Sequence, residues 1–321
     1  MLGTLIKLLF SIVLIGLFLF KVDFGLIKET ILSPECLYAS CLAVAIILLQ
    51  NLIVGFRLIY LTRLFQMNLN WQSALKISFI GSFFAQVMIS FVGGDAMRIW
   101  SLRQYIHNTH AALHIVLLDR IVGFIALIFL LFLSLMPLLQ IISDEKMRLG
   151  VIFLVAWCGI GALSFFLLGG LPSRFKKIKW IGWALDLFSN SRYLLNSKRN
   201  SSYSFLASIG IHFTNILAMF VFFKSYGSSI SFFWCVVLTI PVMFISMLPI
   251  SVAGWGVRES AMLAGFSLIN VPSDLVFAVS VSFGIAHLFA SLPGFFLFLN
   301  ARKTKRGVLI EEPGFALKSR H

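Results

Sequence analysis

The chain has 321 residues, of which 60% are hydrophobic and only 12% are charged. No soluble globular domain needs so apolar a composition, so the chain is predicted to be a polytopic membrane protein. Its net charge of +14 lies in short patches beside the apolar runs. This placement favours membrane orientation and anionic headgroups as its explanation and argues against nucleic acid as a partner.

Apolar runs of about 20 residues, the length needed to cross the hydrocarbon core, recur along the chain. The runs are continuously apolar rather than alternating, which predicts helices and not the strands of a barrel. The first run, 5–20, is expected to be a retained span because no small-residue cleavage site follows it. The other runs are 36–56, 74–92, 113–141, 149–171, 203–223, 231–250 and 259–299, the last interrupted near residue 272.

The basic residues between these runs decide the topology. They cluster at 57–76, at 172–202 and in the C-terminal tail. The positive-inside rule places all three segments in the cytoplasm. If every run crossed the membrane once, the first two segments would face opposite sides, so some runs are predicted not to cross.

Two re-entrant hairpins satisfy the charge rule. Segment 74–110 would enter from the cytoplasm and break at Gly93 and Gly94, whereas segment 231–268 would dip in from outside and break at Gly254 and Gly256. Opposed broken helices of this kind are typical of transporters. The predicted fold class is therefore an all-α polytopic integral membrane protein, with about six full transmembrane helices plus two opposed re-entrant helical hairpins over 1–300 and a basic cytoplasmic tail at 301–321.

Each predicted hairpin carries an arginine four residues after a glycine and near a carboxylate, in GGDAMR at 93–98 and GWGVRE at 254–259. An ionisable group at membrane depth is costly unless it faces protein, water or a ligand, so it is interpreted first as functional. A guanidinium can bind a phosphate or a carboxylate through two parallel hydrogen bonds. Arg98 and Arg258 are therefore the leading candidates to bind a lipid headgroup.

The glycines would let the backbone turn, and a helix starting just after each break would aim its free N–H groups at an anion. The structural alternative is that Asp95 pairs with Arg98, and Glu259 with Arg258, merely to neutralise buried charge. The predicted substrate-binding residues are Gly93, Gly94, Asp95, Arg98, Arg103, Asp119, Arg120, Gly254, Gly256, Arg258 and Glu259.

Two further groups of polar residues have open interpretations. Asp119 and Arg120 either form an interfacial ion pair where a helix begins, or one of them faces the cavity. His107, His110 and His114 would share one face if their segment is helical, but no further ligand completes a metal site, and interfacial histidines are the preferred interpretation. Deeper in the runs, interhelical hydrogen bonding is the preferred role for Gln50, Asn51, His212, Asn215 and His287.

Three ordered motifs carry a resemblance to a known family. The stretches FVGGDAMRIWSLR at 91–103, LDRIVG at 118–123 and LPISVAGWGVRES at 248–260 resemble the flippase-like transmembrane family of lysylphosphatidylglycerol synthases. The resemblance covers about residues 5–300 and implies a bacterial inner-membrane protein that handles aminoacylated or glycosylated lipids. The chain stops at His321 without the family's soluble aminoacyl-transferase domain, so the synthase activity is not expected.

The expected function is transport of a phospholipid, aminoacyl-phospholipid or glycolipid between leaflets, without a cofactor. The alternative is a membrane-embedded enzyme or accessory subunit for lipid glycosylation or aminoacylation. That alternative needs a polar donor site, yet the longest polar stretch, 172–202, has no glycine-rich phosphate loop. The expected partner is a membrane lipid with an anionic or zwitterionic headgroup, while a lipid-synthesis enzyme and further copies of the chain are left open as partners.

Overall fold

The computed structural model describes residues 34–88, 91–168, 193–247 and 256–304, and its regular elements there are helical. The predicted first span at 5–20, residues 172–192 of the basic loop and most of the tail lie outside these ranges. The principal helices are α3 (Pro34–Leu64), α4 (Trp71–Val87), α5 (Phe91–Ile106), α6 (Thr109–Ile141), α7 (Glu145–Leu168), α9 (Lys198–Ser225), α10 (Phe232–Ser246), α11 (Val257–Ser267) and α12 (Ser273–Thr304).

Five of the described helices are long and apolar enough to cross a membrane. The crossing segments are Pro34–Leu64, Thr109–Ile141, Glu145–Phe165, Lys198–Ser225 and Ser273–Asn300. They coincide with the five predicted full spans that fall within the described residues, which confirms an all-α polytopic membrane protein.

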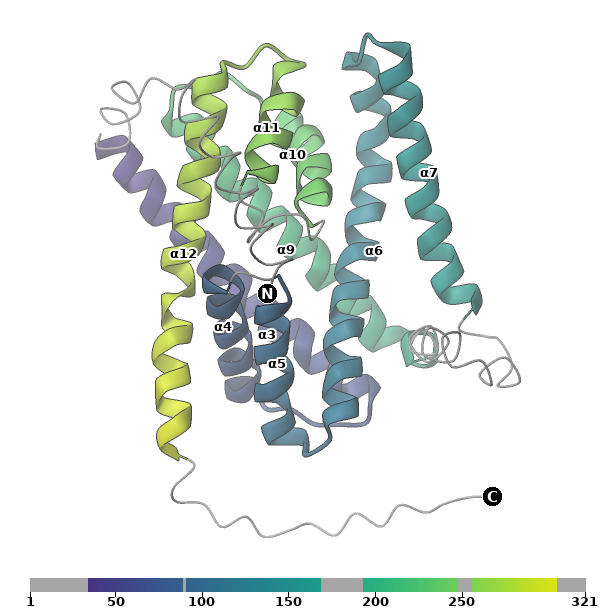
Figure 1. The fold of residues 1–321 in the computed structure, drawn as a ribbon, viewed down its shortest axis with the longest axis vertical. Helices are drawn as coiled ribbons and strands as arrows, with labels where there is room; N and C mark the ends of the chain where they lie inside the picture. Colours follow the sequence, from purple (N-terminus) through teal and green to yellow (C-terminus); the bar gives the residue numbers. More distant parts are fainter. Residues whose placement is uncertain (1–33, 89–90, 169–192, 248–255, 305–321) are drawn as a thin grey trace, which may run out of the picture.

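Four of the principal helices in the described ranges are shorter than a full span. α4 has 17 residues, α5 has 16, α10 has 15 and α11 has 11. At a rise of 1.5 Å per residue even the longest reaches only about 25 Å, less than the hydrocarbon thickness of about 30 Å. Figure 1 shows α4 and α5 in the lower half of the molecule and α10 and α11 in the upper half.

Polar residues at the ends of these helices fix where they begin. The side chain of Asn70 accepts a hydrogen bond from the backbone N–H of Ser73 before α4, and Asn108 does the same for Ala111 before α6. Ser231 caps α10 in this way through its hydroxyl. Such side chains replace the carbonyl partners that the first N–H groups of a helix lack. The four short helices form two pairs, α4 with α5 and α10 with α11. The first helix of each pair therefore begins after a cap residue that can be recognised in the sequence.

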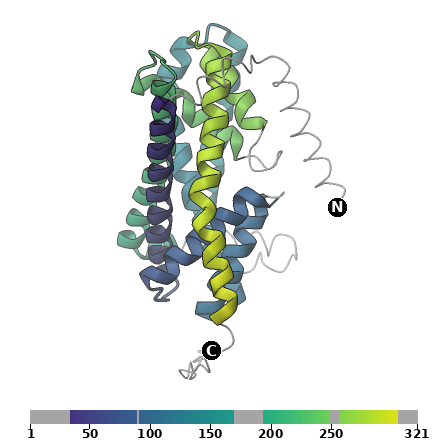
Figure 2. The same ribbon diagram turned by 90° about the vertical axis from the view of Figure 1, so that its left-hand side faces the viewer.

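The connections between helices gather at two ends of the molecule. Residues 65–70, 107–108 and 193–197 lie at the lower end in Figure 1 together with the end of α12, whereas 142–144, 226–231 and 268–272 lie at the upper end. The view in Figure 2 shows the same arrangement from the side, with α12 running the full height. The described parts of the two basic loops and the end of α12, which the charge rule assigned to one side, thus lie at the same end.

The break in the first short pair is not where it was predicted. α4 ends at Val87 and α5 begins at Phe91, so Gly93 and Gly94 lie in the first turn of α5 rather than in a break. Both glycines are buried: a Cβ on Gly94 would lie 2.7 Å from the Cβ of Ala85 on α4, and a Cβ on Gly93 would lie against Met88, directly after the end of α4. They allow two helices to approach closely, as small residues do in membrane proteins, and do not turn the backbone.

The second break agrees better with its prediction. α11 begins at Val257, directly after Gly256, whose φ of 84° lies in the left-handed region that favours glycine. Gly254 lies outside the described residues. The expectation that a helix starts just after the glycine is therefore confirmed for α11 and wrong for α5.

Two long helices form the centre of the packing, because α3 makes its most extensive contact with α9. α12 packs against both α3 and α4, and it lies so close to α4 that a Cβ on Gly294 would overlap the carbonyl group of Phe79. α7, in contrast, packs mainly against α6 and exposes most of its apolar side chains. The short helix pairs therefore pack against the long helices.

The buried apolar side chains form two separate clusters. One lies toward the upper end and includes Phe222, Phe223 and Phe266. The other lies toward the lower end and includes Leu61 and Leu102. Polar and charged side chains from both halves of the molecule line a cavity, which is the candidate site.

Candidate functional site

A cavity of about 320 Å³ lies between the two short helix pairs. Its size falls at the lower end of the range for small-molecule sites, about 300–1,000 Å³. Every described principal helix except α7 contributes to its wall. The polar residues of the wall are Gln50, Asn51, Ser82, Gln86, Arg98, Arg120, His212, Asn215, Ser246, Arg258 and His287.

The cavity brings together the two arginines singled out in the sequence. Arg98 comes from α5 in the lower pair and Arg258 from α11 in the upper pair, 160 positions apart in the chain, and both line the same space. Their side chains are 15% and 11% exposed. Each guanidinium is therefore mostly enclosed by protein but retains a face on the cavity.

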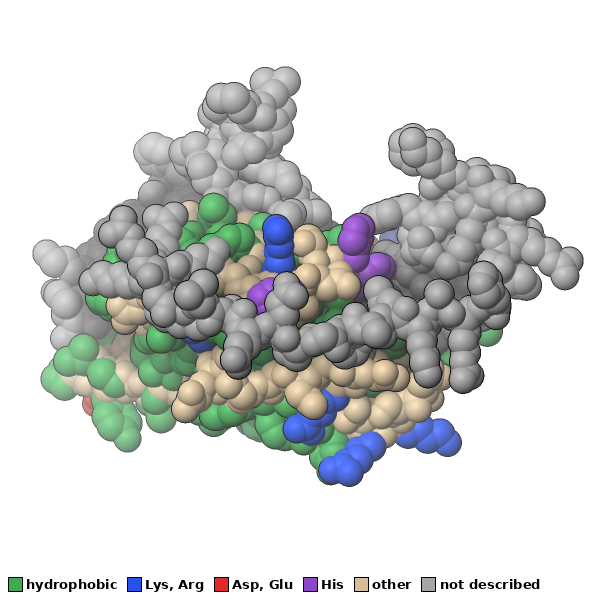
Figure 3. Space-filling view, turned by 90° about the horizontal axis from the view of Figure 1, so that it is seen from below, with side chains coloured by type: hydrophobic (Ala, Val, Ile, Leu, Met, Phe, Trp, Pro, Cys, Tyr) green, Lys and Arg blue, Asp and Glu red, His purple; other side chains and the backbone are tan. Residues whose placement is uncertain are grey.

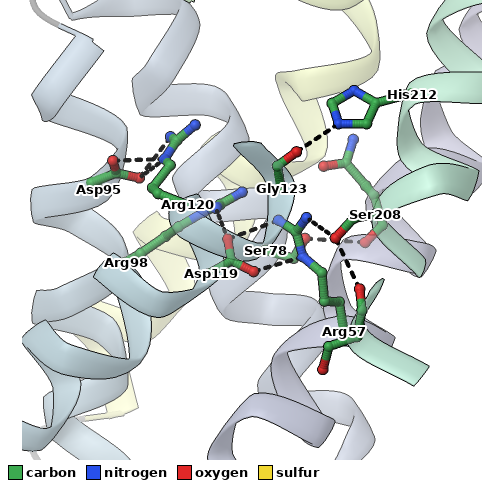
Figure 4. Close-up of polar contacts among 11 residues, drawn as sticks. Arg57, Ser78, Asp95, Arg98, Asp119, Arg120, Gly123, Ser208 and His212 are labelled. Atoms are coloured by element: carbon green, nitrogen blue, oxygen red, sulfur yellow. Dashed lines mark hydrogen bonds and ion pairs between the residues drawn. The ribbon is translucent and has the colours of Figure 1, made fainter. Parts of the chain in front are cut away.

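The lower half of the site is an ion-pair network that joins three helices (Figure 4). Asp119 of α6 contacts Arg57 of α3, with 2.7 Å between Oδ1 and Nε, and Arg98 of α5, with 3.2 Å between Oδ2 and Nη1. Arg57 also donates a hydrogen bond of 2.9 Å to the hydroxyl of Ser208 on α9. A buried carboxylate between two guanidinium groups fixes the positions of the helices that carry them.

A second pair lies next to this network. Arg120 of α6 donates hydrogen bonds from Nε and Nη2 to both carboxylate oxygens of Asp95 on α5, at 2.7–3.1 Å. Asp95 therefore pairs with Arg120 and not with Arg98, so the structural alternative is wrong about the partner of Arg98. The side chain of Arg98 instead passes over Gly81 of α4, where a Cβ would overlap its Cγ and Nε atoms, and reaches Asp119.

Asp119 and Arg120 do not have the places proposed for an interfacial ion pair. Asp119 is the eleventh residue of α6, which begins at Thr109, and its side chain is 4% exposed. It pairs with Arg57 and Arg98, whereas Arg120 pairs with Asp95 and lines the cavity. Of the two interpretations, the one that turns Arg120 toward the cavity agrees with the structure.

The upper half of the site is built more locally. Glu259 accepts a hydrogen bond from the backbone N–H of Gly256 and so caps α11 from its third residue. Its other carboxylate oxygen lies 2.7 Å from Nη2 of Arg258 and 2.9 Å from the hydroxyl of Ser280, which also accepts from Nε of Arg258. The Glu259–Arg258 pair of the structural alternative is therefore present, and the carboxylate of Glu259 already engages the N–H that was expected to face an anion.

The deep polar residues form interhelical hydrogen bonds, as predicted, at two places. His212 of α9 is 3.0 Å from the carbonyl oxygen of Gly123 on α6. His287 of α12 is 3.1 Å from the side-chain oxygen of Asn215 on α9. Both histidines also line the cavity, so its wall combines arginines with neutral hydrogen-bonding groups.

The remaining predicted residues lie elsewhere. Arg103 is exposed in the last turn of α5, and the cavity wall does not include it. His107 lies between α5 and α6 with a φ of 51°, so it cannot share a helical face with His110 and His114. These three residues are at the lower end, where Figure 3 shows Lys, Arg and His side chains on the described part of the surface.

Sequence reasoning missed Arg57 as a member of the site. It was assigned to a basic cytoplasmic segment at 57–76, but α3 continues to Leu64 and buries Arg57, leaving its side chain 8% exposed. The sequence could have indicated that Arg57 lies within the helix, because the apolar sequence LIYL at 58–61 follows it directly and extends the helix. A charge with apolar residues on both sides indicates burial at membrane depth more strongly than a loop.

The comparisons with known proteins agree with this architecture. The family model for the lysylphosphatidylglycerol synthase TM region matches residues 4–294. No curated protein and no solved structure gives a significant match. With five apolar spans, a central charged cavity and a match over nearly its whole length, the chain belongs to the family of the lysylphosphatidylglycerol synthase TM region.

Proposed function

We propose that the protein is a lipid transporter, which moves a phospholipid, aminoacyl-phospholipid or glycolipid between the leaflets of the bacterial inner membrane. The observation that carries this proposal is that Arg98 and Arg258, from opposite helix pairs, line one cavity. A polar headgroup needs such a site because the hydrocarbon core offers it no hydrogen bonds. Arginines from both halves supply contacts to it from each side of the molecule.

The arrangement of the short helices supports the same function. A helix too short to span the membrane ends within the hydrocarbon core, where irregular backbone is tolerated only if protein buries it or water reaches it. Transporters place substrate sites where two such broken elements meet. We infer that α4 with α5, and α10 with α11, are re-entrant hairpins that approach the cavity from opposite sides.

Charge gives the orientation. At the upper end in Figure 1, where α3, α7 and α12 begin and α9 ends, the acids Glu35, Glu145 and Asp274 are accompanied by the basic residues Lys146, Arg148 and Lys224. At the lower end, where α3 and α5 end and α9 begins, Arg63, Arg103, Lys198 and Arg199 have no acid beside them among the described helix ends, so the lower end is the more positive one. Basic residues favour the cytoplasmic side. The lower end is therefore assigned to the cytoplasm.

The function is tested with purified protein in liposomes that contain a fluorescent phospholipid, with no nucleotide, tRNA or sugar donor. The expected result is faster movement of the probe between leaflets, and a loss of that movement in Arg98→Ala and in Arg258→Ala. Removing a charge-assisted hydrogen bond costs about 1.5–3 kcal/mol, or roughly ten- to hundredfold in rate. Arg→Lys at either position should retain part of the lipid movement, because lysine keeps the charge but cannot form two parallel hydrogen bonds.

The matched control is Arg199→Ala, which removes an exposed arginine on α9 far from the cavity wall. It should leave probe movement at the wild-type rate. Normal movement in both cavity variants would make the arginines structural. A lipid product that forms only when a donor is supplied, with leaflet movement at the protein-free rate, would replace the transporter by an enzyme.

A further inference from the structure

The guanidinium group of Arg57 is committed to protein partners. Its Nε is 2.7 Å from Oδ1 of Asp119, and its Nη2 donates a hydrogen bond of 2.8 Å to Oδ2 of the same carboxylate. Its Nη1 donates to the hydroxyl of Ser208 at 2.9 Å. The side chain is buried, and the cavity wall does not include it, whereas Arg98 lines the cavity. Arg57 therefore has no place as a direct ligand of a headgroup.

The sequence of α6 makes room for the guanidinium group of Arg57. A Cβ on Gly123 would lie 3.3 Å from Nη1 of Arg57, which is closer than an ordinary contact. Asp119 precedes Gly123 by four positions, so both residues lie on the same face of α6. That face thus presents a carboxylate and a stretch of open backbone, and a single guanidinium group fits against both.

Arg98 contacts the same carboxylate through one longer contact. Its Nη1 is 3.2 Å from Oδ2 of Asp119, the oxygen that already accepts from Nη2 of Arg57. Charge-assisted N–H···O bonds are usually about 2.7–2.9 Å long. Among the described residues, Nε and Nη2 of Arg98 have no acceptor. Asp119 therefore holds Arg98 in place while most of its N–H groups stay available at the cavity.

Asp95 shows how a carboxylate binds an arginine when no second guanidinium group from the described residues shares it. Nε and Nη2 of Arg120 donate to both of its oxygens, at 2.7–3.1 Å. Two parallel hydrogen bonds of this kind use the edge of the guanidinium group that a phosphate would bind. If Arg57 were absent, both oxygens of Asp119 could bind Arg98 in the same way.

We propose that Arg57 is a positioning residue, which occupies Asp119 so that Arg98 keeps its paired N–H groups for the phosphate of a lipid headgroup. The inference rests on the proposed role of Arg98 in headgroup binding, and it gives Arg57 no contact with the lipid. Arg57 acts through Asp119. When a headgroup binds, Arg98 exchanges at most one contact of 3.2 Å, and Asp119 remains paired with Arg57.

The test measures lipid binding to the detergent-solubilised full-length protein by native mass spectrometry. The probes are phosphatidylglycerol and lysyl-phosphatidylglycerol, which share the phosphodiester. Arg57→Gln is expected to weaken the affinity for both lipids at least about tenfold, which corresponds to about 1.4 kcal/mol. Adding Asp119→Asn to this variant should restore the affinity to within about threefold of wild type, because no carboxylate then competes for Arg98. Arg63→Gln, at an exposed position in the last turn of the same helix, is the matched control and should bind like wild type.

The double variant separates positioning from stability. Arg57→Gln and the double variant both lack the ion pair between α3 and α6, so a purely structural Arg57 predicts equally weak binding in both. That result would overturn the proposal. If Arg57→Gln does not accumulate in the membrane, Arg57→Lys carries the test. Lysine keeps the charge but has no planar pair of donors, so an affinity between those of wild type and Arg98→Ala is expected, and a wild-type affinity would overturn the proposal.

Lipid movement in liposomes separates this inference from transport itself. If the variants bind lipid in the expected order but no fluorescent phospholipid moves between leaflets, the role of Arg57 stands and the transport function fails. If the phospholipid moves and Arg98→Ala stops it, yet Arg57→Gln and the double variant bind lipid equally, transport stands and the positioning role fails.

Discussion

The lower helix pair holds its arginine through other helices, whereas the upper pair holds its arginine through the next residue. Arg98 of α5 contacts Asp119 of α6, which also contacts Arg57 of α3. Arg258 of α11 contacts Glu259 beside it, and Ser280 of α12 joins both. The two sequence motifs look alike, yet one ties several long helices together and the other stabilises the start of a single short helix.

The position of the acid explains this difference. Glu259 is the third residue of α11, where its carboxylate reaches the uncapped N–H of Gly256 and the adjacent arginine at the same time. Asp95 precedes Arg98 by three positions, but the side chain of Arg98 passes over Gly81 toward α6 and leaves Asp95 to Arg120. Similar spacing therefore does not imply similar contacts. Substitutions in the lower half should affect several helices, whereas substitutions in the upper half should affect mainly α11.

The largest effect is expected from Asp119→Asn. This change leaves Arg57 and Arg98 buried without the carboxylate between them, and breaking a buried charge pair costs about 3–5 kcal/mol. The free energy of unfolding, measured by denaturant titration in mixed micelles, should fall by that amount. Asp274→Asn, at an exposed position in the first turn of α12, is the matched control and should change it by less than about 0.5 kcal/mol. Equal stability of the two variants would show that the network does not hold the helices together.

A smaller and more local effect is expected from Glu259→Gln. The amide oxygen can still accept one hydrogen bond, so a loss of about 1–3 kcal/mol is expected rather than the larger loss in the lower half. Hydrogen exchange followed by mass spectrometry should show faster exchange in α11 and unchanged exchange in α4 and α5. Glu145→Gln in the exposed first turn of α7 serves as the control. Faster exchange spread equally over both helix pairs would contradict the interpretation that Glu259 and Arg258 stabilise mainly α11.

The smallest effect on stability, but a clear one on transport, is expected from Gly81→Ala. Alanine favours a helix by about 1 kcal/mol, yet its Cβ would displace the side chain of Arg98 from its path to Asp119. We expect leaflet movement of a fluorescent phospholipid to fall severalfold while the unfolding free energy changes by no more than about 1 kcal/mol in either direction. Gly265→Ala in α11 is the control, because its Cβ would meet Val242 at an ordinary 3.8 Å. Unchanged transport in Gly81→Ala would mean that the path of Arg98 is not needed.

Much of the fold could be predicted because it depends on properties that a sequence displays directly. The length of the apolar runs identified the five described spans, and the charge of the loops pointed to the two segments, 74–110 and 231–268, in which the structure has short helices. Gly256 was predictable as a helix start because glycine is favoured at a left-handed position. The first break was misplaced because Gly94 serves a close contact with α4 and Gly93 one with Met88 directly after it, and glycines in a close contact look the same in sequence as glycines in a turn.

The site was only partly predictable, because its contacts join residues that are distant in the chain. That Arg98 and Arg258 are important follows from charge at membrane depth, but their meeting in one cavity depends on how the long helices pack. The partners of Asp119 come from positions 57 and 98, and no local pattern specifies either contact. Helix packing determines which charges are neighbours, and sequence periodicity does not show it.

The contact between Gly294 and Phe79 has a consequence for the dimensions of the cavity. Two backbones touch there without side chains between them, so no rotamer change can make room for a larger residue at position 294. Any such residue must push α4 away from α12. Because α4 carries Ser82, Ala85 and Gln86 of the wall, the width of the cavity is set in part by a glycine that does not line it. A larger residue at position 294 would therefore change the space available to a headgroup without altering any group that binds it.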